Sequence, residues 1–203
     1  MSHVVHQVRR SVRIRSIVAA LLASIAIVSA CGGGPVASFD PTGACTVDGR
    51  APGGYPELEA LVPRTYEGRG PDRLDSGRNC SPENLGVLAD AGIDEVRFAG
   101  GLWDFGADRG ATLAVFSADG LTAEMLGRFY EASATASNRT RVVTRSEPTI
   151  AGRKGFRIDT ETGPRRQSVV IWGSTVEGRV NVVISSNIPE PKIEAAIAAF
   201  ADR

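Results

Sequence analysis

The hydrophobic pattern divides the chain into an apolar leader, a polar connecting stretch and a long region in which strand-like and helix-like patterns alternate. Six short segments rich in β-branched and aromatic residues predict strands. They are 95–100, 112–117, 142–144, 155–160, 168–174 and 179–185. Turn-forming pairs, Gly163-Pro164 and Glu177-Gly178, separate the last three segments, so we expect an antiparallel meander at this end of the chain.

Helical patterns lie between and after these strands. They cover 56–62, 81–92, 123–134 and 189–200. Ser81 and Thr122 stand where a side-chain cap belongs, and Pro82 suits a first helical position. The polar stretches 66–79 and 101–110 are expected to be loops. Runs of strands followed by helices predict an α+β fold, in which helices pack against an antiparallel sheet, and we expect one such domain over 43–203.

The leader has the composition of an export signal. Arg9, Arg10, Arg13 and Arg15 stand without an acidic neighbour before the uncharged run 17–30. As a helix this run is about 21 Å long, whereas the hydrocarbon core of a bilayer is roughly 30 Å thick. The run is too short to span a membrane, so residues 1–30 are interpreted as a signal peptide.

The end of the leader, Val28-Ser29-Ala30-Cys31, resembles the lipobox of bacterial lipoprotein precursors. The resemblance implies lipid attachment to Cys31, cleavage before it and acylation of the new amino terminus. The mature protein would then be anchored by lipid at the extracytoplasmic face of the cell membrane, with 31–42 as the lipidated cysteine and a flexible Gly- and Pro-containing tether. A non-lipidated signal cut near Ala30 and an uncleaved anchor are the alternatives.

Cysteine usage agrees with export. Apart from Cys31, the chain contains Cys45 and Cys80, an even pair that favours a disulfide in an oxidising compartment. Such a bridge would stabilise the fold by roughly 4 kcal/mol on the chain-entropy account. A metal pair or a catalytic thiol is the alternative, but neither has a neighbouring ligand or base in the sequence.

Charge and composition exclude several functions. After the leader, 19 basic residues stand against 23 acidic ones, a net charge of about −4 that disfavours a nucleic-acid partner. Both histidines, His3 and His6, belong to the leader. The mature chain therefore lacks a histidine base for serine or cysteine hydrolysis and histidine ligands for zinc. Because nucleotide-binding motifs are also missing, we expect no cofactor, no metal and no catalytic residue of these kinds.

Carboxylates are the remaining candidates for catalysis. Six acids fall within about thirty residues: Asp94, Glu95, Asp104, Asp108, Asp119 and Glu124. Two of them would suffice for a glycosidase-like hydrolase, provided that a cleft brings them together. Residues 104–108 also contain two acids in a calcium-like spacing, but the alternating acids of an EF-hand loop are missing. Turns and a helix start explain most of these positions without catalysis.

Two tryptophans are candidate binding residues. Trp172 belongs to an apolar run and is interpreted as core. Trp103 and Phe105 fall in the expected loop 101–110, where they are candidates for an exposed aromatic patch that binds a ligand. The competing interpretation, a loop folded back over the sheet, is the favoured one.

The element order of 149–200 is similar in outline to the PsbP-like fold of some exported actinobacterial lipoproteins. The chain as a whole favours a non-catalytic binding or interaction module at the cell envelope, with a small apolar ligand or a protein as partner. As a binding module it should have an apolar groove or cavity between sheet and helices. The carboxylate hydrolase and a purely structural role remain alternatives.

Overall fold

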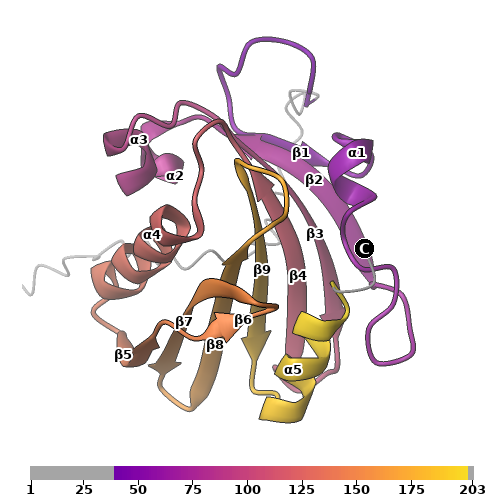
Figure 1. The fold of residues 1–203 in the computed structure, drawn as a ribbon, viewed down its shortest axis with the longest axis vertical. Helices are drawn as coiled ribbons and strands as arrows, with labels where there is room; N and C mark the ends of the chain where they lie inside the picture. The colour runs from indigo at the N-terminus through magenta and orange to yellow at the C-terminus, as the bar shows by residue number, and fades with distance from the viewer. Residues whose placement is uncertain (1–38, 201–203) are drawn as a thin grey trace, which may run out of the picture.

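Residues 39–200, which the computed structural model describes, form one antiparallel sheet with helices on both faces (Figure 1). The strands in this range are β1 (Gly49–Ala51), β2 (Arg73–Asn79), β3 (Val96–Asp104), β4 (Gly110–Ser117), β5 (Thr140–Ser146), β6 (Thr149–Ile150), β7 (Arg153–Thr162), β8 (Arg165–Gly173) and β9 (Arg179–Ser186). The helices are α1 (Pro56–Glu59), α2 (Pro82–Leu85), α3 (Val87–Asp90), α4 (Ala123–Ala136) and α5 (Glu190–Ala198). The predicted α+β class is confirmed.

The strand order across the sheet is β1-β2-β3-β4-β9-β8-β7-β5, and β6 pairs with β7. The chain builds β1 to β4 in sequence, then crosses through α4 to β5 at the opposite edge. It returns through β7 and β8, and β9 completes the sheet by pairing with β4. The predicted meander of the last three long strands is therefore confirmed.

Both faces of the central strands are buried, and β8 shows why its sequence is a continuous apolar run. Val169 and Ile171 point to one face, whereas Val170 and Trp172 point to the other, and none of the four is more than 4% exposed. A strand covered on both sides has no polar alternation. We call the side covered by α4 the α4 face and the side covered by α5 the α5 face.

The α5 face is closely packed. Trp103, Leu113 and Trp172 lie at its centre, and α5 closes it with Ile193 and the nearby Phe200. The Trp172 and Phe200 rings meet edge to face, with 5.3 Å between their centroids. Residues of α1 and the loop after it extend this cluster towards β2 and β3.

The α4 face has a second cluster. Leu126 and Tyr130 of α4 pack against Phe156 and Ile171, and the short helices α2 and α3 add leucines beside them. The Thr122 hydroxyl accepts a hydrogen bond from the Met125 amide at 3.2 Å, so the predicted cap of α4 is confirmed. Helix α4 lies over β7, β8 and β9. It therefore covers the other part of the sheet, from β4 to β1, less closely.

Three local expectations were wrong. The expected loop 66–79 contains β2, and the expected loop 101–110 is a tight hairpin because β3 continues to Asp104. The expected helix 81–92 is two short helices, α2 and α3. Gly86 separates them at φ +50°, a conformation that interrupts a helix and that glycine adopts without strain. The segment 39–200 nevertheless contains all the described strands, both clusters and the bonded cysteine pair.

Candidate ligand-binding site

A cavity of about 740 Å³ lies on the α4 face, between the sheet and the helices. Strands β3, β4 and β9 supply its floor, α4 supplies one wall, and β1, β2 and the α2–α3 corner supply the rim. Its volume falls within the roughly 300–1,000 Å³ typical of small-molecule sites. Its described lining includes Arg50, Asp75, Phe98, Gly100, Thr112, Ala114, Phe116, Phe129, Tyr130 and Ile184.

Small side chains create this space. Gly100 of β3 lies opposite Ala114 of β4, and Thr112 lies opposite Ile184 of β9. The last turn of α4 also contributes small side chains to the lining, namely Ala132, Ser133 and Ala136. Neither surface fills the gap between helix and sheet, so the hollow follows from residue size.

Aromatic rings border the cavity. Phe98 and Phe116 pair across β3 and β4 with 6.0 Å between ring centroids. Phe129 of α4 lies edge to face with Tyr130 at 5.5 Å. The lining is therefore mostly apolar and aromatic, which suits the hydrophobic part of a small molecule.

Tyr130 adds a polar group to the apolar wall. Its side chain is only 9% exposed, and its hydroxyl makes no hydrogen bond with any residue of 39–200. Burial raises the pKa of the phenol well above its usual value, so the group is neutral and keeps its proton. Tyr130 is thus a donor available to a bound molecule.

Charged residues gather at the β1–β2 rim. Asp75, which is 8% exposed, forms a salt bridge with Arg73, with 3.0 Å between Arg73 Nε and Asp75 Oδ2. Arg50 approaches the same carboxylate only to 3.8 Å. Nη2 of Arg73 is buried without a hydrogen-bond partner among the described residues. The rim therefore has more guanidinium donors than Asp75 satisfies.

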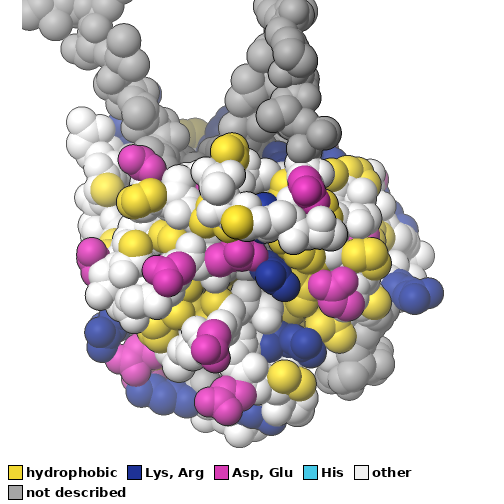
Figure 2. Space-filling view, turned by 90° about the horizontal axis from the view of Figure 1, so that it is seen from above, with side chains coloured by type: hydrophobic (Ala, Val, Ile, Leu, Met, Phe, Trp, Pro, Cys, Tyr) yellow, Lys and Arg dark blue, Asp and Glu magenta, His cyan; other side chains and the backbone are white. Residues whose placement is uncertain are grey.

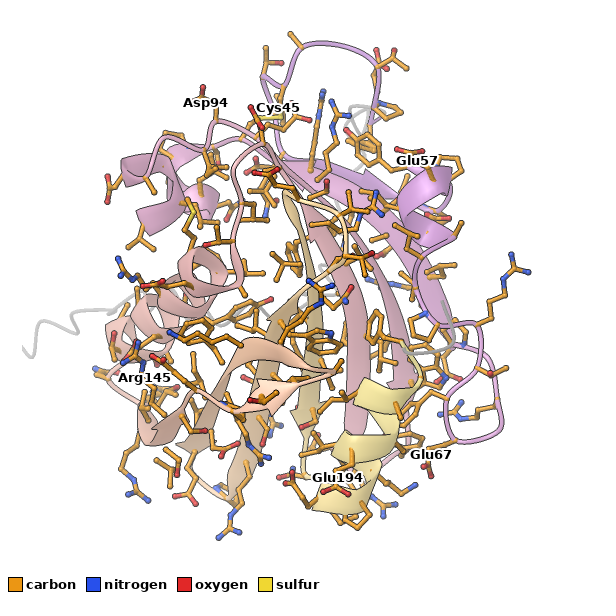
Figure 3. The ribbon with its side chains drawn as sticks, in the orientation of Figure 1. Cys45, Glu57, Glu67, Asp94, Arg145 and Glu194 are labelled. Carbon is orange, nitrogen blue, oxygen red and sulfur yellow. A yellow bond between two sulfur atoms is a disulfide. The ribbon has the colours of Figure 1, made fainter. Side chains whose placement is uncertain are left out.

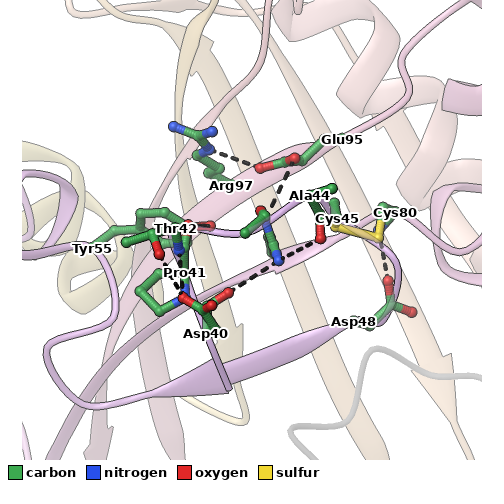
Figure 4. Close-up of polar contacts among 12 residues, drawn as sticks. Asp40, Pro41, Thr42, Ala44, Cys45, Asp48, Tyr55, Cys80, Glu95 and Arg97 are labelled. Carbon is green, nitrogen blue, oxygen red and sulfur yellow. Dashed lines mark hydrogen bonds and ion pairs between the residues drawn. A yellow bond between two sulfur atoms is a disulfide. The ribbon is translucent and has the colours of Figure 1, made fainter. Parts of the chain in front are cut away.

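The predicted disulfide between Cys45 and Cys80 is confirmed, and it fixes the same rim (Figure 4). Asp48, between β1 and the bridge, accepts hydrogen bonds from the Cys80 amide at 2.6 Å and from the Ser81 amide at 2.9 Å. The Ser81 hydroxyl and the Asn84 side chain donate to its other oxygen. Burial opposes ionisation of Asp48, but these hydrogen bonds outweigh it and lower the pKa of the carboxyl.

Arg78 holds the segment that precedes β1. Its buried guanidinium donates to the carbonyl oxygens of Gly43 at 2.7 Å, Asp40 at 3.0 Å and Ala44 at 3.1 Å. Glu95 lies 3.9 Å away and balances the charge. These contacts lie on the α5 side of β2 and position the chain that leads into the rim.

The structure places the predicted aromatic patch away from this cavity. Trp103 belongs to β3, is 0% exposed in the α5-face cluster, and donates from Nε1 to the Arg69 carbonyl at 3.0 Å. Of the two interpretations of Trp103, the exposed patch is wrong and burial against the sheet is right, although Trp103 is buried as part of β3 and not of a loop. Phe105 is partly buried between the cations of Arg69 and Lys192, at 5.1 and 4.8 Å from its ring centroid. Neither aromatic residue is among the described residues that line the cavity.

The six candidate acids also lie elsewhere. Asp94 points outward at the upper edge of the molecule (Figure 3), and Glu95 pairs with Arg97 at 2.8 Å. Asp104, Asp108, Asp119 and Glu124 are exposed. On the surface seen from above, acidic and basic side chains are interspersed with hydrophobic ones (Figure 2). The six acids do not line the cavity, so they do not provide the paired carboxylates there that a hydrolase requires.

Sequence reasoning missed the lining itself. Phe98 and Phe116 were assigned to strands, but their meeting over a hollow depends on the register of β3 and β4. Arg50 and Asp75 gave no signal, because they belong to strands that the pattern did not predict. Cys31, the predicted lipidation site, lies outside the described residues.

Among residues 39–200, no group of three or more potential protein ligands for a metal is found. No helix in this range is long and apolar enough to cross a bilayer. Compared with known proteins, the chain matches no family model and no curated relative.

Proposed function

We propose that this protein is a lipid-anchored binding module that holds a small apolar ligand in the cavity on the α4 face. The observation that carries the proposal is the cavity itself, with its aromatic border and its floor of small residues. A concave, mostly apolar space between secondary-structure elements is the usual form of a small-molecule site.

The proposal assigns binding without catalysis. The chain after residue 6 has no histidine, and the six candidate acids do not line the cavity. The acids that do line it, Asp48 and Asp75, are engaged in hydrogen bonds or ion pairs of the rim, and Glu83 is exposed. The arrangement favours a ligand held by shape and by a few polar contacts.

Ligand binding can be tested with the neutral fluorescent probe N-phenyl-1-naphthylamine. A version beginning at Gly32 keeps the complete described sheet, both core clusters and the disulfide. We expect the probe to bind it with increased fluorescence. Thr112→Trp places an indole in the cavity and should abolish binding, because Thr112 lies on the floor.

The matched control is Thr144→Trp on β5, at the opposite edge of the sheet, where the side chain is exposed. This variant should bind the probe as the parent does. Cooperative urea unfolding of all three proteins establishes that they are folded. A folded parent that does not bind the probe, or equal binding by all three proteins, would count against the cavity as a ligand site and would favour a protein partner.

The anchor is tested separately in cells. Growth with a radioactive fatty acid should label the full chain and place it in the membrane fraction, because the leader resembles that of a lipoprotein precursor. Cys31→Ala should remove the label. An unlabelled parent chain would remove lipid anchoring from the proposal without affecting ligand binding.

A further inference from the structure

The charged rim indicates which kind of apolar molecule the cavity accepts. Among the described lining residues, Arg50 is the only cation. We propose that Arg50 binds the carboxylate of a long-chain acid whose hydrocarbon part lies over the floor of the cavity. This inference rests on the proposed function and adds the chemistry of the ligand's head group.

The acids of the rim are already engaged or solvated. Asp48 accepts hydrogen bonds from Cys80, Ser81 and Asn84. Asp75 is paired with Arg73 at 3.0 Å, and Glu83 is exposed. These carboxylates are stabilised within the protein, so none of them requires a cationic ligand.

Arg50, in contrast, keeps its donors available. Its one ionic contact among the described residues is the 3.8 Å approach to Asp75, and it makes no hydrogen bond within 39–200. A guanidinium has five N–H donors arranged for two-point contact with a carboxylate. The side chain is 31% exposed, which leaves it reachable from the rim.

The charge next to Arg50 is positive, because Arg50 and Arg73 share the single carboxylate of Asp75 and the three side chains carry a net charge of about +1. Asp48, held by its own hydrogen bonds, and the exposed Glu83 bring the charged rim as a whole to about −1, so the attraction for an anion is confined to Arg50. Nη2 of Arg73 is buried and has no hydrogen-bond partner among the described residues, but Arg73 does not itself line the cavity, so Arg50 is the cation that a ligand can reach. A ligand carboxylate would neutralise the excess charge where part of the surrounding surface is apolar, which strengthens the ion pair.

The rest of the cavity suits a hydrocarbon chain. Phe98 and Phe116 form an apolar pair at one end of the floor, Ala114 follows on β4, and Ile184 of β9 lies opposite Thr112 at the other end. Tyr130 provides one neutral donor on the α4 wall. A charged end at Arg50 and an apolar body over the strands therefore match the polarity of the site from rim to floor.

The test compares two ligands of equal length, dodecanoate and 1-dodecanol, as competitors of N-phenyl-1-naphthylamine at pH 8. Both are kept below the concentration at which they aggregate. We expect dodecanoate to displace the probe from the Gly32 version at about tenfold lower concentration than dodecanol. Arg50→Gln should remove this preference, so that dodecanoate and dodecanol displace the probe at similar concentrations.

Two further variants sharpen the test. Arg50→Lys keeps the charge but loses the two-point contact, so it should retain a reduced preference for dodecanoate. Arg141→Gln removes an exposed arginine from β5 at the opposite edge and should leave the preference unchanged. Added salt should weaken the displacement by dodecanoate and not that by dodecanol.

The outcomes distinguish the two proposals. Equal displacement by acid and alcohol in the parent, or a preference that persists in folded Arg50→Gln, would overturn the head-group assignment while probe binding upholds the cavity. A folded parent that binds no probe would overturn both. If Arg50→Gln does not fold, the ratio of the dodecanoate and dodecanol concentrations that displace the probe from the parent decides the question.

Discussion

Strands β3 and β4 present one filled face and one hollow face, and the difference lies in side-chain size. On the α5 face they carry Trp103, Leu113 and Val115, each at most 1% exposed. On the α4 face the same strands carry Gly100, Thr112 and Ala114 beneath a cavity of about 740 Å³. Successive residues of a strand point to opposite faces, so adjacent positions can contribute separately to stability and to an open site.

The comparison also shows where stability and binding are expected to separate. The filled face has large side chains in edge-to-face contact, for example Trp103 and Tyr66 with 5.7 Å between centroids. Changes there should lower the free energy of unfolding with little effect on ligand binding. Changes on the hollow face should mainly weaken ligand binding and should alter the free energy of unfolding less.

The largest effect is expected from Trp103→Ala. It removes a fully buried indole and its hydrogen bond to the Arg69 carbonyl, and should lower the free energy of unfolding by about 4 kcal/mol. Phe116→Ala, in the partly exposed lining of the cavity, should cost about 1–2 kcal/mol and weaken probe binding. Urea unfolding and probe titration measure both quantities. Equal losses of stability would contradict the difference between the faces.

Removal of the disulfide should have the next largest effect. The double variant Cys45→Ala/Cys80→Ala should lower the free energy of unfolding by about 3 kcal/mol, because the unfolded chain gains freedom. Urea unfolding with and without a reductant provides the check. Reductant should destabilise the parent version by a similar amount and leave the double variant unchanged. If reductant does not affect the parent, the bridge does not stabilise the fold.

Two adjacent glycines allow the sharpest comparison of the faces. A Cβ at Gly101 would lie 2.8 Å from the buried Trp103 ring, so Gly101→Ala should cost about 1–3 kcal/mol. At Gly100 the nearest atom is the Ala114 Cβ at 3.5 Å, an ordinary contact. Gly100→Ala should therefore stabilise the protein by about 0.5 kcal/mol, because the unfolded chain becomes less flexible. Urea midpoints decide the signs, and a gain at Gly101 would refute the close packing of the α5 face.

The last prediction concerns Asp48, whose modest contribution to stability depends on pH. Its pKa in the folded state lies below the ordinary value of 3.8, because hydrogen bonds outweigh the opposing effect of burial. The stabilisation is therefore fully present above about pH 4 and is lost as the pH falls through the lower folded-state pKa. Asp48→Asn should cost about 1 kcal/mol at pH 7, a modest value because solvent screens the group. The difference in free energy of unfolding between Asp48→Asn and the parent, measured with urea, should become smaller at pH 3. A difference that stays constant would contradict a lowered pKa of Asp48 in the folded state.

Local pattern was sufficient for the elements whose burial follows from their own residues. The apolar run of β8, the capped start of α4 and the meander from β7 to β9 were predicted correctly. The pairing of Cys45 with Cys80 followed from the count of cysteines. In each case the relevant information lies within a short segment or in residue identity.

Strand β2 shows why other elements were missed. It buries Asp75, Ser76 and Arg78, which polarity alone places in a loop. Their partners are distant in sequence: the Ser76 hydroxyl accepts from the Tyr55 amide at 2.6 Å, and Arg78 donates to carbonyls of the segment before β1. Polar groups can be buried when such partners satisfy them, and a local pattern does not contain that information.

A cavity between sheet and helices was expected, but the residues that line it were not. A binding module with a groove between sheet and helices was predicted, but the aromatic residues proposed for it, Trp103 and Phe105, lie outside the described lining. The lining depends on the register that sets Gly100 opposite Ala114 and on the position of α4. An empty volume is a property of several elements together, and it has no sequence signature of its own.

The hydrogen bonds and the disulfide that hold the segment before β1 have a mechanical consequence. Arg78 binds three carbonyl oxygens between Asp40 and Ala44, and the bridge at Cys45 follows immediately. A pull on the chain before Asp40 would therefore be borne by β2, inside the sheet, before it reached the three-residue edge strand. A force applied to the chain on the amino-terminal side of Asp40 should therefore leave the shape of the β1–β2 rim unchanged.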